Sequence, residues 1–128
     1  MVNGKWLMVN ERKYSERKSI QICVANCKTL SISRKEKKEF VMLKQVLRSG
    51  TSIGANIEEA NQAQSKSDFI HKLSISQKES FETHYWIRIL RDSDFLVEKL
   101  ADSLLEDCEE IQKLITSSIK TAKINLQK

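Results

Sequence analysis

Two histidines, His71 and His84, are the side chains of this sequence best suited to bind a metal ion or to carry a proton. The motif Asp68-x-x-His71 places both side chains on one face of a helix, as in carboxylate-bridged metal bundles. Such a site needs the motif on two helices and further glutamates, whereas one copy is present here. His84 lies close to a stripe of core positions, so we interpret it as a hydrogen-bonded packing residue. We therefore expect no metal site.

The other reactive side chains do not form a catalytic arrangement. Glu58 and Glu59 are adjacent, and adjacent helix positions point about 100° apart, so the two carboxylates cannot hold one substrate atom. No serine or cysteine has a partner histidine at a recognisable spacing, and Gly50 and Gly54 do not match a phosphate-binding loop. The sequence predicts a protein that is not an enzyme and has no cofactor. An enzyme or metal protein is kept as the third hypothesis.

The three cysteines, Cys23, Cys27 and Cys108, are odd in number and fall at helical core spacing. We interpret them as reduced, buried residues of a cytoplasmic protein. Residues 1–10 lack the features of a signal peptide. No apolar run approaches the ~20 residues of a membrane span, so we expect no membrane association.

The composition favours a few long helices. The 128 residues include no proline and three glycines, too few turn-forming residues for a β-rich protein of this size. Helical periodicity predicts helices over about 14–30, 34–61, 66–91 and 98–123. The predicted caps are Ser33 with Glu36, and Ser65 with Asp68 or Ser67 itself. We expect an all-α, antiparallel up-down-up-down four-helix bundle over residues 14–128, preceded by an arm over 1–13 that is either packed or mobile.

Glycine marks the predicted buried side of the helix over 34–61. The stripe consists of Leu43, Leu47, Gly50, Gly54 and Ile57. Glycine in a helix interior costs ~1 kcal/mol relative to alanine. We therefore expect Gly50 and Gly54 to permit tight packing against another helix. Equivalent stripes are predicted for the other two helices: Phe69, Leu73, Ser76, Ser80, Thr83, Ile87 and Leu90, and Leu104, Cys108, Ile111, Ile115, Ser118 and Ala122.

The helix over 66–91 has a second stripe, roughly opposite the first, formed by Ile75, Glu79, Glu82, Trp86 and Ile89. Helices that are apolar on two sides are usually buried on two sides. We predict a homo-oligomer built through this face and the outward face of the helix over 34–61. In it, Arg48 pairs with Glu59, Glu79 or Glu82 across a subunit boundary. The alternative is that Trp86 lies over its own bundle or under the N-terminal residues.

Basic side chains occur in clusters, and the formal net charge is +5. Such runs are usually a solvated face, but they also suit the phosphate backbone of RNA or DNA. Any binding should then depend on shape and charge rather than on base sequence. The candidate nucleic-acid residues are Arg17, Lys18, Arg34, Lys35, Lys37, Lys38, Lys113, Lys120 and Lys123.

Residues 47–60 (Leu-Arg-Ser-Gly-Thr-Ser-Ile-Gly-Ala-Asn-Ile-Glu-Glu-Ala) resemble the signature of a bacterial four-helix-bundle family. That family is named for open reading frames in intervening sequences of 23S ribosomal RNA genes. The resemblance continues through residues 64–75, 78–79, 82–88 and 104–110. It implies a homo-pentamer with no enzymatic activity, and interhelical or intersubunit ties at Arg48, Asn56, Glu59, Glu79 and Glu82. In a related branch, the accessory proteins of diversity-generating retroelements, the pentamer binds nucleic acid and a reverse transcriptase.

Two main hypotheses follow. The first is a non-enzymatic, oligomeric scaffold or adaptor of the cytoplasm that binds RNA or DNA, and possible partners include a reverse transcriptase. The second is a structural or protein-binding module whose positive charge is incidental.

Overall fold

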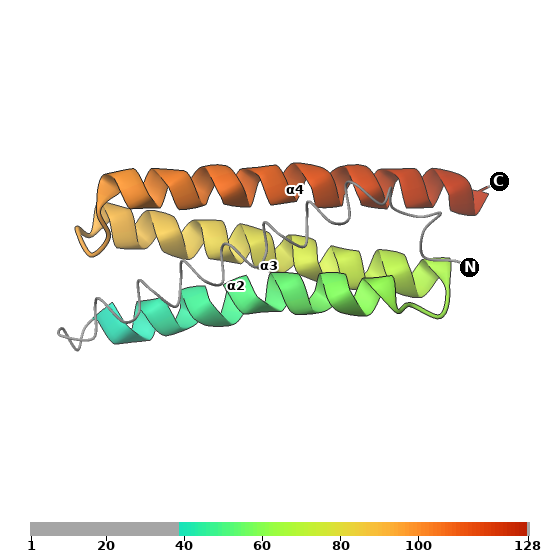
Figure 1. The fold of residues 1–128 in the computed structure, drawn as a ribbon, viewed down its shortest axis with the longest axis horizontal. Helices are drawn as coiled ribbons and strands as arrows, with labels where there is room; N and C mark the ends of the chain where they lie inside the picture. Colours follow the sequence, from blue (N-terminus) through green and yellow to red (C-terminus); the bar gives the residue numbers. More distant parts are fainter. Residues whose placement is uncertain (1–38, 128) are drawn as a thin grey trace.

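The computed structural model describes residues 39–127 and places three long helices, with no strand, in this part of the chain (Figure 1). They are α2 (Glu39–Asn61), α3 (Lys66–Asp92) and α4 (Glu98–Gln127). The predicted all-α class is confirmed for these residues. The expected arm over 1–13, the expected helix over 14–30 and the first residues of the helix expected over 34–61 lie outside the described range. So do six candidate basic residues: Arg17, Lys18, Arg34, Lys35, Lys37 and Lys38.

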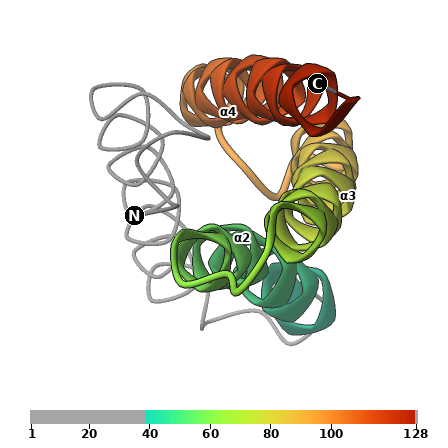
Figure 2. The ribbon, with the colours of Figure 1, turned by 90° about the vertical axis from the view of Figure 1, so that its right-hand side faces the viewer.

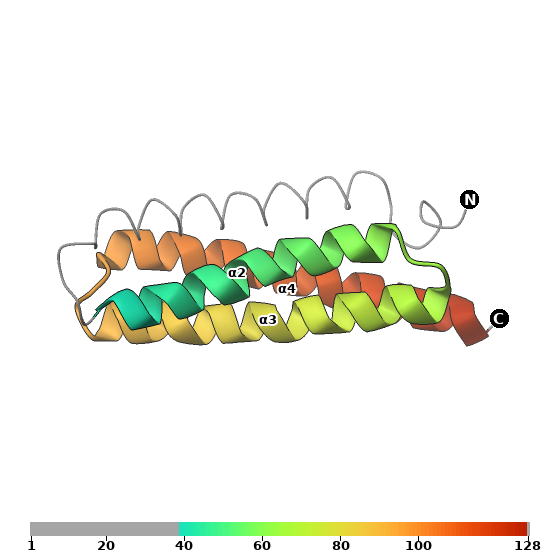
Figure 3. The same ribbon diagram turned by 90° about the horizontal axis from the view of Figure 1, so that it is seen from below.

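Consecutive helices run antiparallel, and α3 lies between its two neighbours. The end-on view shows α2 and α4 packed on different sides of α3 (Figure 2). Seen from below, α2 and α3 lie next to each other and α4 passes behind them (Figure 3). The connections span only residues 62–65 and 93–97, and short connections place successive helices antiparallel.

Local hydrogen bonds set the ends of α3. The Ser65 hydroxyl accepts a hydrogen bond from the Asp68 amide at 3.0 Å, so Ser65 rather than Ser67 is the N-cap. At the other end the Ser93 amide donates to the Ile89 carbonyl, and the Phe95 amide donates to Leu90 at 2.9 Å. Asp94 between them has φ of 61°, a left-handed conformation that aspartate tolerates better than most residues.

Helix α4 continues to Gln127, beyond the expected end near Lys123. The end was predicted near Lys123 because the apolar pattern stops at Ala122. The helix continues further because no glycine or proline follows Ala122 in the sequence. The Lys66 ammonium donates to the Asn125 carbonyl at 3.2 Å, which ties this last part of α4 to the start of α3.

Small hydroxyl residues separate two hydrophobic clusters in the core. One cluster surrounds Phe69 and Ile111, and the other surrounds Ile87 and Leu104. Between them lies a hydroxyl layer, formed by the fully buried Ser49, Ser76, Ser80 and Thr83. The Ser76 hydroxyl donates to the Ile53 carbonyl at 2.9 Å, and the hydroxyls of Ser49 and Thr83 are 2.9 Å apart. The layer therefore joins α2 to α3 by buried hydrogen bonds.

The buried face of α2 differs from the expected stripe. Gly50 is buried, but Leu47 and Gly54 are only half-buried. The core positions are Leu43, Val46, Ser49, Gly50, Ile53, Ile57 and Ala60. From Leu43, a step of four residues leads to Leu47 and a step of three leads to Val46, so two neighbouring stripes are possible. The stripe that includes Val46 and Ile53 is the buried one. Hydrogen bonds between α2 and α3 involve Arg48, Ser49 and Ile53. Tight packing at Gly50 and Gly54 stays a prediction.

Candidate functional site

The side of α3 that faces α2, here called the α2 flank, is closed by charged and polar contacts. The Arg48 guanidinium lies 3.5 Å from Glu79 and also hydrogen-bonds to Glu82. The Trp86 indole N–H donates to the same Glu82 oxygen at 3.2 Å. Nearer the α2–α3 connection, Lys72 pairs with Glu59 at 2.7 Å, and this hydrogen bond raises the pKa of the Lys72 ammonium.

These contacts bear on one expectation about the oligomer. Inside one chain Glu59 pairs with Lys72, and Arg48 contacts Glu79 and Glu82. The pairing of Arg48 across a subunit boundary stays a prediction. The cation also compensates a buried carboxylate oxygen, Oε2 of Glu79, which has no hydrogen bond. The α2 flank thus carries opposite charges in contact.

The remaining predicted interface residues lie on α3 with intermediate burial. Ile75 and Ile89 are half-buried. Trp86 packs against the cluster around Ile87, and its ring meets Tyr85 edge-on with centroids 5.3 Å apart. Within one chain, Trp86 therefore lies over its own bundle, which is the alternative given above to a place in a subunit contact.

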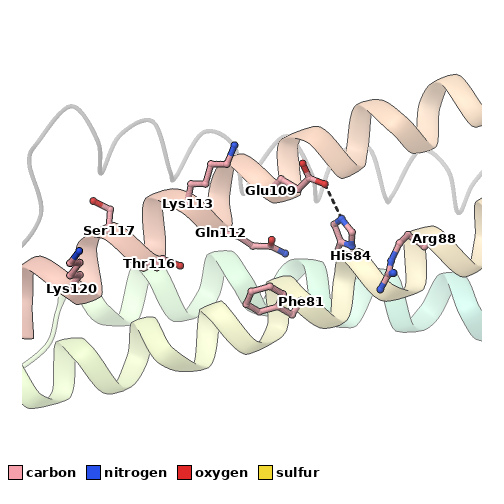
Figure 4. A pocket seen from close by; sticks show the side chains of 9 residues that line it. All are labelled: Phe81, His84, Arg88, Glu109, Gln112, Lys113, Thr116, Ser117 and Lys120. Atoms are coloured by element: carbon pink, nitrogen blue, oxygen red, sulfur yellow. Dashed lines mark hydrogen bonds and ion pairs between the residues drawn. The ribbon is translucent and has the colours of Figure 1, made fainter.

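The opposite side of α3, the α4 flank, carries an open groove of about 850 Å³, here called the basic groove. Side chains of α3 line one wall of this groove and side chains of α4 line the other (Figure 4). They are Phe81, His84, Arg88, Glu109, Gln112, Lys113, Thr116, Ser117 and Lys120. Two of the predicted nucleic-acid residues, Lys113 and Lys120, are therefore brought together with Arg88, which the sequence did not single out.

The charges of the basic groove are unequal. It contains three cations, Arg88, Lys113 and Lys120, all exposed and none in an ion pair with another residue of the 39–127 range. The single carboxylate, Glu109, is 3.2 Å from Nε2 of His84. Lys123, the third lysine predicted on this helix, is exposed one turn beyond Lys120. The groove therefore has a positive surplus.

A polar seam between α3 and α4 adjoins the groove and shares the lining residues Gln112 and Thr116 with it. The Cys108 thiol and the Gln112 amide both donate to the Ser80 carbonyl, at 3.1 Å and 3.2 Å. The Gln77 amide donates to the Thr116 hydroxyl at 2.8 Å. Burial, helped by the nearby charge of Glu109, raises the pKa of Cys108 from 9.0 to about 12. Cys108 is thus protonated at neutral pH and is no activated nucleophile.

Sequence reasoning missed most of the groove. Phe81, His84 and Arg88 follow one another at helical spacing, as do Lys113, Thr116 and Lys120. Each set is an ordinary exposed stripe until α3 and α4 are known to be neighbours. His84 was expected to be hydrogen-bonded, and it is, through Glu109.

Other kinds of site find no support in the described residues. Within residues 39–127, no group of three or more histidine, cysteine, aspartate or glutamate side chains is placed to hold a metal ion. No helix in the same range is long and apolar enough to cross a membrane.

The described part of the chain is thus an all-helical protein of long antiparallel helices with a basic surface groove. The chain belongs to the 23S rRNA-intervening sequence protein family, whose model matches residues 15–117. It is also similar to a crystal structure from Bacteroides thetaiotaomicron, described as a protein with unknown function from the S23 ribosomal protein family. The two superpose with a TM-score of 0.81 and 45% sequence identity, over 86% of this chain and 98% of that chain. No curated protein matches the sequence.

Proposed function

We propose that the protein is a non-enzymatic, homo-oligomeric helical adaptor that binds RNA or DNA through its basic surface. The observation that carries this proposal is the positive surplus of the basic groove, where Arg88, Lys113 and Lys120 have no acidic partner among residues 39–127. Arginine and lysine that neutralise phosphates release bound counterions, and this release drives binding independently of base sequence.

Charge segregation along α4 supports the same proposal. Six acidic residues occur between Glu98 and Glu110, whereas no acidic residue follows Glu110 in this helix. The helix dipole favours lysine near a helix C-terminus, but its effect is limited to about the last turn. Lys113 lies far before that turn in a helix that extends to Gln127, so the dipole does not account for it.

The outward faces of α2 and α3 support self-association. Val41 of α2 and Tyr85 of α3 are exposed, and Ile75 and Ile89 of α3 are half-buried. Large exposed apolar side chains on neighbouring helices are a common feature of subunit contacts. We propose an oligomer through these faces, in the pentameric form that the family resemblance implies. Light scattering should then give a multiple of the 14.8 kDa chain mass. A purely monomeric species would remove this part of the proposal.

Nucleic-acid binding is tested by fluorescence anisotropy with labelled RNA and DNA at 50 and 200 mM salt. Three phosphate contacts to a single strand predict a slope of about −2 in log K against log salt, hence roughly 20-fold weaker binding at the higher salt. The double variant Lys113→Glu with Lys120→Glu should abolish measurable binding. The matched control, Lys78→Glu with Lys99→Glu, makes the same charge change on exposed residues outside the groove.

No binding by the unmodified protein at 50 mM salt would reject the nucleic-acid role and leave the protein-binding module. A reverse transcriptase is the protein partner that the family resemblance implies for the adaptor. Co-purification of the two proteins with and without RNA tests this further step.

A further inference from the structure

We infer that the basic groove takes a single strand of nucleic acid, with a base stacked on Phe81, and discriminates against a duplex. This inference rests on the proposed function and deepens it, because it names the form of nucleic acid and the residue that selects it.

The first argument is the exposure of Phe81. Its ring is 56% exposed although it lies inside the groove, beside His84 and Arg88 on the same helix (Figure 4). Large aromatic rings are normally buried, so an exposed ring inside a groove lined by cations is an accessible stacking surface.

The second argument is the spacing of the cations along the opposite wall. Lys113 and Lys120 are seven residues apart in α4, about 10 Å at the helical rise of 1.5 Å per residue. The hydroxyls of Thr116 and Ser117 lie between them in the groove lining. This wall therefore offers two charges and two hydroxyl groups to a phosphate backbone, while the aromatic wall is supplied by α3.

Together the walls have the two components that single-strand sites combine, a positive groove for the backbone and aromatic faces for the bases. A duplex hides the faces of its bases, so it could use only the lysine wall. An acidic peptide could use the same lysines, but its carboxylate side chains offer no aromatic ring to stack on Phe81. The exposed ring in the cationic groove favours a single strand over both.

The experiment compares the unmodified full-length protein with Phe81→Ala, Phe81→Trp and the matched control Leu100→Ala, an exposed apolar residue outside the groove. The probes are a labelled single-stranded 12-mer and a duplex of the same sequence, measured by anisotropy at 50 mM salt. Loss of one base–aromatic stack should weaken single-strand binding of Phe81→Ala by about 5- to 100-fold. Duplex binding should change by less than about twofold, and Phe81→Trp and Leu100→Ala should bind the single strand like the unmodified protein.

The inference is overturned if Phe81→Ala binds the single strand normally, or if it loses single-strand and duplex binding equally. It is also overturned if Phe81→Ala sediments as a smaller species, because Phe81 would then belong to a subunit contact. In each of these cases, salt-dependent binding by the unmodified protein would leave the proposed function standing. Failure of the unmodified protein to bind either probe would reject both proposals.

Discussion

The two flanks of α3 carry similar residue types, but the cations of the α2 flank are paired and those of the basic groove are unpaired within the described residues. On the α2 flank, Arg48 contacts Glu79 and Glu82, and the hydroxyl layer continues the contact into the core. On the α4 flank, Arg88 has no acidic partner within residues 39–127 and lies beside an open groove. Compensated charges hold helices together, whereas an uncompensated charge beside a groove is available to a ligand.

This difference shows that an exposed arginine does not by itself indicate a binding site. Arg48 and Arg88 are both exposed, yet only Arg48 lies against carboxylates. Residues of the α2 flank should therefore affect stability, and residues of the basic groove should affect binding. The predictions that follow test this division, in order of expected size.

The largest effect is expected from filling the hydroxyl layer. Ser76 is fully buried between α2 and α3, so Ser76→Leu should overpack the contact and remove the hydrogen bond to Ile53, costing ~1–3 kcal/mol or more. The control Ser117→Leu, in the groove lining, should change the unfolding free energy by less than about 0.5 kcal/mol. Urea denaturation measures both. Equal effects would show that the two flanks are not different in packing.

The next effect compares the two arginines. Arg48→Ala leaves the buried Oε2 of Glu79 without its nearby cation, and we expect a loss of about 1–2 kcal/mol in stability. Arg88→Ala should leave stability within about 0.5 kcal/mol and instead weaken nucleic-acid binding. Thermal denaturation and anisotropy separate the two outcomes. A variant Arg88→Ala that melts as low as Arg48→Ala would contradict the division.

A smaller effect tests whether the polar seam between α3 and α4, beside the groove, is closed to water. With Cys23→Ser and Cys27→Ser in place, Cys108 is the single remaining thiol. Its pKa is raised to about 12 in the folded protein, against 9.0 ordinarily. A raised pKa means that the folded state keeps the proton more tightly. The resulting stability is complete below pH 9 and is lost as the pH rises towards 12.

The expected loss is roughly 1 kcal/mol by pH 10. The measurement compares the unfolding free energy of this protein with that of the same protein carrying Cys108→Ala. The difference between the two is followed as the pH rises. The thiol should also resist a disulfide reagent at pH 8 until the protein is unfolded. Rapid labelling of the folded protein would show that water reaches Cys108 through the groove.

The smallest effect concerns the connection that closes the α4 flank. Asp94 is the one non-glycine residue with positive φ among residues 39–127. Asp94→Gly should relieve this conformation and stabilise the protein by about 0.5 kcal/mol. Asp92→Gly, two residues earlier and still helical, should instead destabilise it by ~0.5–1 kcal/mol. A calorimetric shift of the same sign in both variants would be inconsistent with this reading of the connection.

The sequence predicted the parts of the fold that depend on one helix alone. All seven expected core positions of α3, from Phe69 to Leu90, are buried, because apolar and small side chains follow the helical period without interruption on this face. The buried face of α2 was harder, since Leu47 and Val46 are both apolar and begin neighbouring stripes. Features shared by two helices could not be predicted in full. The structure pairs Arg48 with Glu79 and Glu82 inside one chain, and pairing across a subunit boundary stays a prediction. Phe81 was not noticed.

The hydroxyl layer also determines how the helices can be aligned along their length. A purely aliphatic seam would let α3 slide by one turn against α2 with little change in contact. Here such a slip would separate Thr83 from Ser49 and Ser76 from the Ile53 carbonyl. The buried Ser76 hydroxyl would be left unpaired, at ~1–3 kcal/mol. The buried hydroxyl groups thus favour one axial register of α2 against α3.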